Sequence, residues 1–354
     1  FGHSRLITNG YSDNQPVVRG NILVLHNGIV VNHEDLWQRI GKTRKLEVDS
    51  EIIAGIAEHE LEVGTELGRI PVRIMELCEG VIACALALPC FGKILLFSND
   101  GSLYVGRKGA SILFASERYP LKVIGCTNIE QVRDAIQIDI PKSDELLLTD
   151  HSTRKNNIVP ALVLHSAEEK LLHYEMPHLR RCTKCLLPET MPFISFDSEG
   201  VCNYCRNYVP RNVPKDKQEL FNLVAPYRRP EKENDCIVPF SGGRDSSYTL
   251  HLVVNELKMK PIAYTYDWGM VTDLGRRNIS RICAKLGVEN IIVAADIKNK
   301  RRNIAMNLKA WLKSPNLGMI SILTAGDKQF FRYVETIKEQ TGIQLDLWGI
   351  NPLE

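Results

Sequence analysis

Two glycines in the segment PFSGGRDSSY stand where an apolar run meets a helix-like pattern. The run CIVPF (residues 236–240) predicts a short buried strand, and from Leu250 onward apolar residues recur at helical spacing. Because glycine has no Cβ, the N–H groups of Gly242 and Gly243 can point at one anion, and the helix start adds partial positive charge. An ordinary tight turn with Ser and Asp caps is the alternative. The longer string Ser-Gly-Gly-x-Asp-Ser favours a site for phosphate or pyrophosphate.

Four of the ten cysteines form two Cys-x-x-Cys pairs, and sixteen residues separate the pairs. They are Cys182, Cys185, Cys202 and Cys205. Each pair can close a tight turn that aims two thiolates inward, so the spacing predicts a tetrahedral zinc site. Four thiolates leave no open position, so such a metal would stabilise structure rather than catalyse. Two disulfides or an iron–sulfur cluster are the alternatives.

The elements that would position these residues differ between the two ends of the chain. The first ~150 residues predict strands and turns, with helices near 34–40 and 49–63. Asn27-Gly28 interrupts the apolar stretch 21–31, which suggests two short runs around a turn. This pattern predicts an α+β region that is rich in antiparallel sheet.

From residue 236 onward, strands and helices alternate, which predicts a doubly wound parallel α/β sheet. Further strands are expected at 262–266, 290–294 and 344–350, with helices near 303–313 and 327–340. Ligands of such sheets bind at the carboxyl ends of the strands. Ser241 to Ser246 and Asp267 are expected at those ends.

Composition excludes several classes of protein. The chain has 354 residues, and 44% of them are hydrophobic, as in globular proteins. Its net charge of +2 is too small to favour binding of nucleic acid. No apolar run approaches the ~18 residues of a membrane span, and we expect a cytoplasmic protein. The chain begins at Phe1 and ends at Glu354 inside apparently structured sequence, so we expect a piece of a longer protein.

The string SGGRDSS after a strand resembles the PP-loop of the ATP pyrophosphatase superfamily, which splits ATP between its α- and β-phosphates. The resemblance implies that the loop holds the pyrophosphate of ATP, with Asp245 as a ligand of Mg²⁺. The implied contacts are Ser241, Gly242, Gly243, Asp245 and Ser246. Asp267 would contact the ribose or a metal, and a helix cap is the alternative for this residue.

Residues 182–354 resemble the N-acetyl sugar amidotransferases of lipopolysaccharide and surface-polysaccharide biosynthesis. The carriers of this resemblance are RCTKCLLPETMPFISFDSEGVCNYC, then VPFSGGRDSSY, with YTYDWGMVTDLGRRN, TAGDKQFF and WGINPLE fitting more loosely. It implies transfer of ammonia to an adenylated acetamido group of a nucleotide-linked sugar, giving an acetamidino group, AMP and pyrophosphate.

The pieces GHSRLITNG, NQPV, LHNGIVVN and VDSE resemble the class II glutamine amidotransferase domain of asparagine synthetases. The resemblance implies that Arg5 and Asp49 hold glutamine, while Asn27 and Gly28 form an oxyanion hole. A hairpin turn at Asn27-Gly28 and a surface pair of Arg5 with Asp49 are the alternatives. The family's nucleophile is an N-terminal cysteine, whereas this chain begins with Phe1, so we expect the chain itself to hydrolyse no glutamine.

These resemblances predict three parts. Residues 1–160 would be a class II glutamine amidotransferase-like domain with a truncated N-terminal-nucleophile (Ntn) sandwich, 178–212 a four-cysteine zinc module with a linker, and 230–354 a PP-loop ATP pyrophosphatase domain that lacks its C-terminus. We expect ATP, Mg²⁺ and structural Zn²⁺ as cofactors, and glutamine or an ammonia donor and a nucleotide-linked N-acetyl sugar as partners. A homodimer is a further expectation.

Two other enzyme classes remain open as alternatives. An asparagine synthetase-like ligase shares both chemistries but shows no four-cysteine module between its domains. A PP-loop tRNA-thiolating enzyme would need a sulfur-carrying cysteine near the active site, whereas Cys283 lies on the apolar face of a predicted helix.

Overall fold

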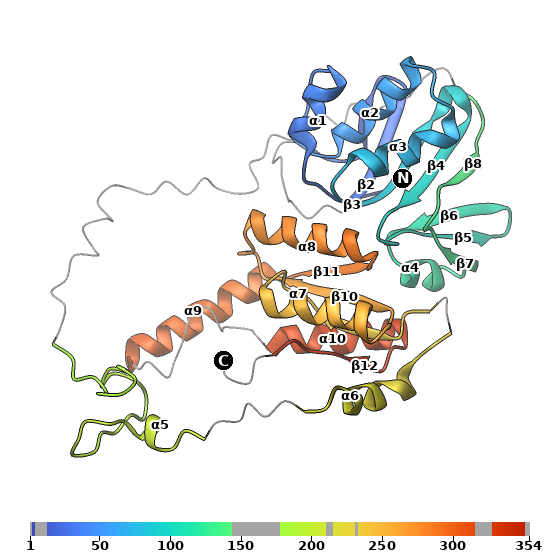
Figure 1. The fold of residues 1–354 in the computed structure, drawn as a ribbon. Helices are drawn as coiled ribbons and strands as arrows, with labels where there is room; N and C mark the ends of the chain where they lie inside the picture. The colour runs from blue at the N-terminus through green and yellow to red at the C-terminus, as the bar shows by residue number, and fades with distance from the viewer. Residues whose placement is uncertain are drawn as a thin grey trace. The chain divides into compact units, whose positions relative to one another are not determined.

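A computed structural model describes residues 2–3, 13–143, 178–209, 215–230, 233–315 and 328–350 (Figure 1). The chain divides into two compact units. Unit 1 contains Phe1–Ile158, Val224–Ala295 and Phe331–Glu354, and unit 2 contains Val159–Leu223 and Asp296–Phe330. The boundaries 1–160, 178–212 and 230–354 remain a prediction.

The N-terminal part of unit 1 is built on a five-stranded antiparallel sheet. Its strands are β1 (Val17–Arg19), β2 (Ile22–Val30), β3 (Gly80–Leu88), β4 (Lys93–Ser98) and β8 (Ile136–Asp139), in the order β1-β2-β3-β4-β8. In β3 every residue is buried, because both faces of the sheet are covered.

Side-chain alternation along β3 divides the buried residues between two cores. Ile82, Cys84 and Leu86 belong to a core that also contains residues of the three helices. These helices are α1 (His33–Ile40), α2 (Glu51–Glu62) and α3 (Ile70–Leu77), the last preceded by the 3₁₀ turn η1 (Leu67–Arg69). Ala83 and Ala85 face the opposite core, whose small side chains pack beside Leu103 and Val132.

A second antiparallel sheet has the order β6-β5-β7. Its strands are β5 (Tyr104–Lys108), β6 (Ser111–Ala115) and β7 (Thr127–Gln131), with α4 (Arg118–Val123) between β6 and β7 and the 3₁₀ turn η2 (Pro89–Phe91) between β3 and β4. Gly101 and Gly109, with φ of +86° and +58°, turn the chain before β5 and between β5 and β6. Glycine is suited to both turns because it tolerates positive φ.

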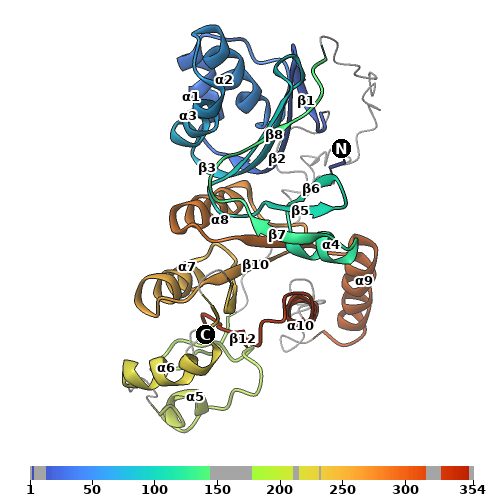
Figure 2. The same ribbon diagram turned by 90° about the vertical axis from the view of Figure 1, so that its right-hand side faces the viewer.

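The C-terminal sheet of unit 1 is entirely parallel, with the order β11-β10-β9-β12. Its strands are β9 (Cys236–Pro239), β10 (Pro261–Asp267), β11 (Asn290–Ala294) and β12 (Leu345–Asp346). The accompanying helices are α7 (Arg244–His251) with its π-helical continuation η5 (Leu252–Glu256), α8 (Asp273–Leu286) and α10 (Lys328–Thr341), as Figure 2 shows. The chain steps outward from β9 to β11 and then returns to β12 on the other side of β9, so the strand order reverses at β9.

Unit 2 contains the cysteine pairs, the short helix α5 (Asn203–Arg206) and α9 (Ile297–Lys313). Helix α6 (Lys217–Val224) and the 3₁₀ turn η4 (Ala225–Tyr227) follow the cysteine region. Helix α9 starts six residues before the predicted start at 303, because the Asp296 side chain accepts the N–H of Asn299 and caps the helix there.

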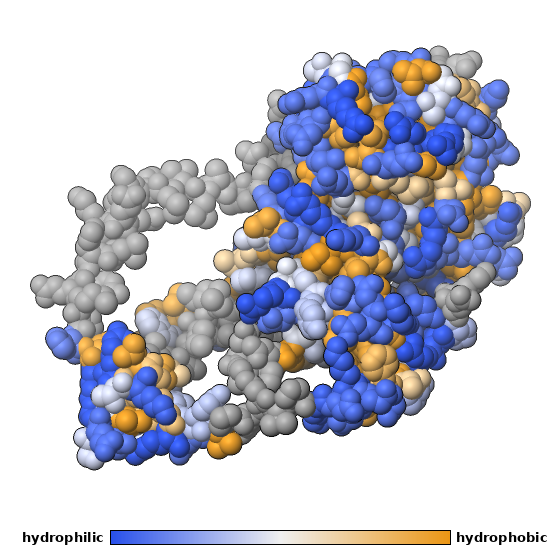
Figure 3. Space-filling view, viewed as in Figure 1, coloured by the Kyte–Doolittle hydropathy of each residue, from blue (hydrophilic) through white to orange (hydrophobic). Residues whose placement is uncertain are grey.

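The predicted fold class is confirmed: the described residues form antiparallel Ntn-like sheets, a four-cysteine cluster and a parallel sheet with helices. The predicted C-terminal strand is shorter than expected and covers only Leu345–Asp346. Figure 3 shows hydrophilic and hydrophobic residues interspersed over one face of the molecule. Within the described ranges, no helix has both the length and the apolar composition needed to cross a bilayer.

Candidate active sites and metal site

Asn27 and Gly28 lie inside strand β2, opposite Ala83 and Ile82 of β3. The hairpin-turn alternative is therefore wrong, and the stretch 21–31 is one strand rather than two short runs. The Asn27 side chain is exposed and makes no hydrogen bond to any part of the chain that the structure describes. Its amide N–H₂ group is therefore available to a ligand.

The backbone explains why residue 28 is glycine. Gly28 has φ of +148°, and a Cβ at this position would overlap the carbonyl oxygen of Val81. Such a close approach of two strands requires a residue without a side chain. Glycine is therefore required at the position where the resemblance predicts an oxyanion-hole N–H group.

Asp49 precedes α2 and is only 3% exposed. Its Oδ2 atom accepts a hydrogen bond from the Val30 N–H at 2.7 Å. The carboxylate is therefore held against the end of the strand that carries Asn27 and Gly28. Burial excludes the alternative of a surface pair for Asp49, while Arg5 lies outside the described residues.

A buried polar network fixes the backbone beside Asn27. The His26 ring places Nδ1 2.9 Å from Ser50 Oγ and Nε2 3.1 Å from the Val81 carbonyl oxygen. Gln15 binds the main chain of the same residue through two hydrogen bonds. Its Oε1 accepts the His26 N–H at 2.6 Å, and its Nε2 donates to the His26 carbonyl at 2.8 Å. Burial lowers the pKa of His26, so its imidazole is neutral. Nε2–H therefore donates to Val81, and Nδ1 accepts from Ser50.

The predicted phosphate loop connects β9 to α7, as the sequence indicates. Gly242 has φ of +74°, in the left-handed region, and Gly243 is the residue before α7. Ser241 and Gly243 are exposed, while Gly242 is half-buried. Because the strand order reverses at β9, this loop follows the carboxyl end of the strand at the topological switch point.

Among the described residues, the N–H groups of Ser241 and Gly243 donate to hydroxyl groups of the loop itself. The Gly243 N–H donates to Ser241 Oγ and the Ser241 N–H to Ser246 Oγ, both at the long distance of 3.3 Å. The two hydroxyl oxygens lie 3.1 Å apart. Neither amide is bound to a main-chain carbonyl in these bonds, so both could turn to an anion. Asp245 is half-buried and forms an ion pair with exposed Arg244 at 3.2 Å.

Asp267 ends strand β10 and is 4% exposed. Its Oδ2 accepts from Arg276 Nη2 at 2.9 Å, and its Oδ1 accepts from the Gly269 N–H at 2.8 Å. The helix-cap alternative is wrong for Asp267, because Thr272 caps α8 by accepting the Gly275 N–H. Asp267 therefore anchors the first turn of α8 to the carboxyl end of β10.

A cavity of about 400 Å³ lies within unit 1. Its walls include Asn27, Gly28 and Asp49 from the N-terminal part, and Asp267 and Arg276 from the parallel sheet. One hollow thus touches both predicted sites. The residues of the phosphate loop do not line it, but Ile279, whose Cγ1 atom would lie 2.8 Å from a Cβ at Gly242, does.

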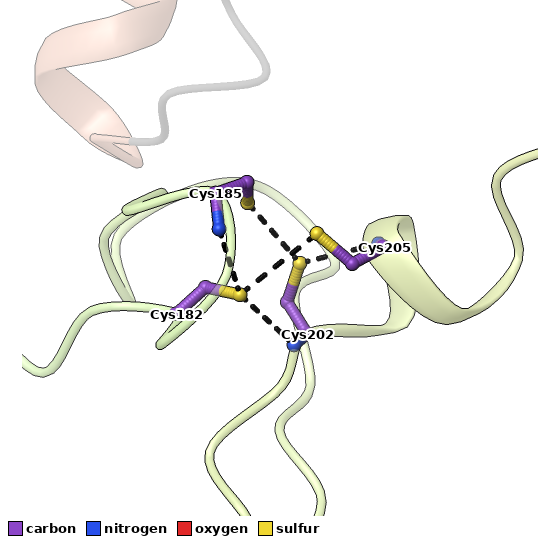
Figure 4. Close-up of side chains that lie close together, drawn as sticks. All are labelled: Cys182, Cys185, Cys202 and Cys205. Atoms are coloured by element: carbon purple, nitrogen blue, oxygen red, sulfur yellow. Dashed lines mark hydrogen bonds between the residues drawn. The ribbon is translucent and has the colours of Figure 1, made fainter.

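The four predicted zinc ligands come together in unit 2 (Figure 4). Cys182 Sγ lies 3.9 Å from Cys205 Sγ, and Cys185 Sγ lies 3.6 Å from Cys202 Sγ. All four sulfurs are within 4.8 Å of one another. A tetrahedral zinc site with Zn–S bonds of ~2.3 Å has edges of about 3.8 Å, so this donor set could bind a metal such as zinc. All four cysteines are free, which contradicts the disulfide alternative.

Main-chain amides surround the Cys182 sulfur. Burial opposes ionisation, but the N–H groups of Cys185, Cys202 and Lys184 point at Sγ and lower the pKa of Cys182 to about 6. The Cys202 N–H lies 3.2 Å from this sulfur, and the Lys184 N–H lies 3.3 Å from it. A thiolate is the form that binds a metal, so the knuckle is already suited to a cation.

Two residues of these sites were not identified from the sequence. Arg276, which pairs with Asp267, occurs in the quoted stretch YTYDWGMVTDLGRRN, where nothing distinguishes it from the adjacent Arg277. Ser280 is 4% exposed on α8 and hydrogen-bonds to the Val81 N–H at 2.9 Å. Its position beside Ile279 and one turn before Cys283, among apolar residues, is the signal that could have revealed it. Cys283 itself is buried, and burial raises its pKa.

Residues 3–123 match the family described as Glutamine amidotransferase domain. The glutamine–fructose-6-phosphate aminotransferase [isomerizing] of Vibrio vulnificus (strain YJ016) is 31% identical over 120 residues, which are 32% of this chain and 18% of that protein. The enzyme of the same name from Escherichia coli (strain K12) is 30% identical over 128 residues, 34% of this chain and 21% of that protein. The chain thus spans about a fifth of the length of these curated relatives.

Two solved structures are similar in part. The glutamine phosphoribosylpyrophosphate amidotransferase from B. subtilis, complexed with ADP and GMP, is 23% identical with a TM-score of 0.34, covering 39% of this chain and 32% of that chain. A predicted subunit of tRNA methyltransferase from Methanocaldococcus jannaschii DSM is 19% identical with a TM-score of 0.23. The similarity covers 34% of this chain and 54% of that chain. From the family match over residues 3–123 and the antiparallel Ntn-like sheets, the N-terminal part of this chain is a class II glutamine amidotransferase domain.

Proposed function

We propose that this chain belongs to an ATP-dependent amidotransferase that converts the acetamido group of a nucleotide-linked sugar to an acetamidino group, in lipopolysaccharide or surface-glycan biosynthesis. Glutamine supplies the nitrogen, and ATP is split to AMP and pyrophosphate. The sugar substrate is inferred from the resemblance of residues 182–354. The coupling of two chemistries is inferred from the arrangement of unit 1.

One observation carries the proposal: Asn27, Gly28 and Asp49 line the same cavity of about 400 Å³ as Asp267. Ammonia released into bulk water at neutral pH would be protonated and would lose its nucleophilic lone pair. A shared hollow would let the nitrogen pass from the proposed glutamine site toward the end of β10 without that loss.

The proposed glutamine site uses one carboxylate and one oxyanion hole. Asp49, held by the Val30 N–H, would bind the amino group of glutamine. The exposed Asn27 amide and the Gly28 N–H would stabilise the oxyanion that forms when the glutamine amide is attacked. The neutral His26 keeps this backbone in place without adding a charge.

The proposed ATP site uses the switch point of the parallel sheet. The acetamido oxygen attacks the α-phosphorus of ATP, the bond to the bridging oxygen breaks, and pyrophosphate leaves. The amides of Gly242 and Gly243 would stabilise the charge on the leaving pyrophosphate. Ammonia then attacks the activated carbon, and AMP leaves with the original oxygen. The product is an acetamidino group.

Two metals fit the side chains present. Mg²⁺ prefers oxygen ligands and usually binds through one or two carboxylates together with phosphates, and Asp245 offers a half-buried carboxylate beside the loop. Bound Mg²⁺ would neutralise phosphate charge there. Zn²⁺ would be held by the four cysteines, where no coordination position remains for chemistry.

The test uses ammonium chloride as nitrogen source, so that it does not depend on the glutamine site. Protein containing this chain is incubated with ATP, Mg²⁺, NH₄Cl and UDP- or CMP-linked acetamido sugars. We expect AMP and an amidino sugar in equal amounts, measured by chromatography and mass spectrometry. ADP in place of AMP would reject the adenylation chemistry, and conversion of labelled aspartate to asparagine would favour an asparagine synthetase-like ligase.

Two serines in the first turn of α7 provide a matched pair of variants. Ser246→Ala removes the hydroxyl that contacts Ser241 in the loop and should slow AMP formation about tenfold or more. Ser247→Ala removes a hydroxyl that donates to the Gly243 carbonyl at 2.7 Å, outside the proposed anion contacts. It should change the rate by less than about threefold. Equal effects of the two variants would contradict the assignment of the loop.

A further inference from the structure

Helix α8 contacts the phosphate loop directly. A Cβ at Gly242 would lie 2.8 Å from Ile279 Cγ1 and 3.1 Å from the Gly275 carbonyl oxygen, so the loop backbone rests on the helix. A displacement of Gly242 toward the helix would therefore act on Ile279, because the space between them is too small for a methyl group.

The next residue of the helix reaches the N-terminal sheet. Ser280 Oγ accepts the Val81 N–H at 2.9 Å and lies 3.3 Å from the Ile29 carbonyl oxygen, to which it donates. A hydroxyl group from α8 is thus inserted between β2 and β3. Ile29 immediately follows Gly28, the predicted oxyanion-hole residue.

The Ser280 hydroxyl meets the sheet at a paired position of β2 and β3. The Val31 N–H donates directly to the Glu79 carbonyl oxygen at 2.7 Å, and β2 pairs Ile29 with Val81 two residues further along. An antiparallel ladder places its next direct hydrogen bonds there. With Ser280 in place, its hydroxyl bridges the Val81 N–H and the Ile29 carbonyl.

The contact extends into the polar network below the glutamine site. The Val81 carbonyl accepts from His26 Nε2, and His26 Nδ1 accepts from Ser50, the neighbour of Asp49. A change at Val81 therefore reaches both parts of the proposed glutamine site. The first turn of α8 is fixed by the ion pair of Arg276 with Asp267, so the helix can transmit a displacement as a rigid element.

We propose that Ser280 is a positioning residue that couples anion binding at the phosphate loop to the Asn27–Gly28 segment of β2. This inference rests on the proposed function. Its consequence is that the glutamine site responds to nucleotide, so that ammonia is released when an acceptor can be activated. By linkage, glutamine would change the affinity for nucleotide by the same factor, typically 5–150-fold for coupled sites.

Hydrogen–deuterium exchange tests the coupling in the chain itself, without glutamine hydrolysis. Calorimetry first measures binding of Mg·ATP to wild type, Ser280→Ala and Ser280→Thr. In wild type, nucleotide should slow exchange in peptides covering residues 25–31 and 80–84 by about fivefold or more. In Ser280→Ala the affinity for nucleotide should stay within about twofold, and the slowing should disappear. Ser280→Thr, which keeps the hydroxyl, should restore it.

Two further variants keep the test decisive if Ser280→Ala does not fold. Ile279→Ala removes the Cγ1 atom that contacts Gly242 and should reduce the response while Ser280 stays in place. Arg277→Ala, on the exposed face of the same helix, should respond as wild type.

The possible results separate the two proposals. Nucleotide binding without slower exchange in wild type would overturn the coupling alone, as would a wild-type response in both Ser280→Ala and Ile279→Ala. No binding of Mg·ATP to wild type would overturn the proposed function and the coupling with it.

Discussion

Single residues in this chain are constrained by close backbone approaches. The sequence Asn27-Gly28 has the composition of a hairpin turn, yet it lies within a nine-residue strand. The deciding contact is with Val81, whose carbonyl occupies the space that a side chain at residue 28 would need. Gly242 is constrained in the same way by Ile279 of a helix thirty-seven residues later.

The constraint at residue 28 predicts a large loss of stability in Gly28→Ala. The new methyl group must displace the Val81 carbonyl. In addition, the φ of +148° at residue 28 is unfavourable for alanine. We expect the free energy of unfolding in urea to fall by about 3 kcal/mol. Gly20→Ala is the control: φ is +56° there, but nothing lies within 4 Å, so the loss should be about 1 kcal/mol. Equal losses would contradict the role of the overlap.

At the scale of elements, helix α8 is held by a buried charge pair. Asp267 is nearly inaccessible, and Arg276 provides two donors to its Oδ2 atom. The helix also supplies Ile279 to the phosphate loop and Ser280 to β3. The position of α8 therefore depends on the ion pair in which Arg276 compensates the buried negative charge of Asp267.

Arg276→Ala should destabilise unit 1 by about 3 kcal/mol, because it leaves the Asp267 carboxylate buried with the Gly269 N–H as its remaining strong donor. Chemical unfolding followed by circular dichroism measures the loss. The neighbouring Arg277→Ala, at an exposed position, should change stability by less than about 0.5 kcal/mol. A loss in Arg276→Ala no larger than in this control would show that the pair contributes little.

The two cysteine knuckles form an element that depends on a metal. We expect about one zinc per chain by mass spectrometry of the metal content. Cys185→Ser should lower this value to near zero, because a hydroxyl is a poor ligand compared with a thiolate. Cys90→Ser, in the 3₁₀ turn η2, should leave it unchanged. Iron with visible absorption in place of zinc would contradict the prediction.

At the scale of the whole of unit 1, a buried carboxyl joins the N-terminal sheets to the parallel sheet. Glu289 Oε2 accepts the Tyr104 hydroxyl at 2.6 Å, and both residues are buried. Burial raises the pKa of Glu289 to about 8, with Asp100 and Glu117 adding to the effect. The carboxyl is therefore protonated at neutral pH in the folded chain.

The raised pKa predicts that unit 1 becomes less stable as pH rises. Between pH 4.5, the ordinary pKa of a glutamate, and about pH 8, the folded state binds a proton that the unfolded state has lost. This contribution to the free energy of unfolding is on the order of 2–4 kcal/mol. It is fully present below pH 4.5 and is lost as the pH rises to about 8. Glu289→Gln stays neutral, so its stability should fall less between about pH 5 and pH 8.5 in urea titrations. A wild-type slope in this variant would contradict the prediction, and Glu130→Gln, exposed on β7, is the control.

Features that involve residues close together along the chain could be predicted from the amino-acid sequence. Glycines between a strand and a helix, and cysteine pairs at short spacing, involve neighbours along the chain. The position of the loop between β9 and α7 and the clustering of the four cysteines could therefore be predicted. The alternation of strands and helices predicted the parallel sheet for the same reason.

The contacts that support the sites could not be predicted from the sequence and are seen in the folded chain. The supporting contacts join residues that are far apart in sequence or indistinguishable from their neighbours. They are the contacts of Asp49 with β2, of Arg276 with Asp267, of Ser280 with β2 and β3, and of Tyr104 with Glu289. No local period or spacing encodes such contacts, because they arise when separate elements bury their polar groups against one another and each buried group must find a partner.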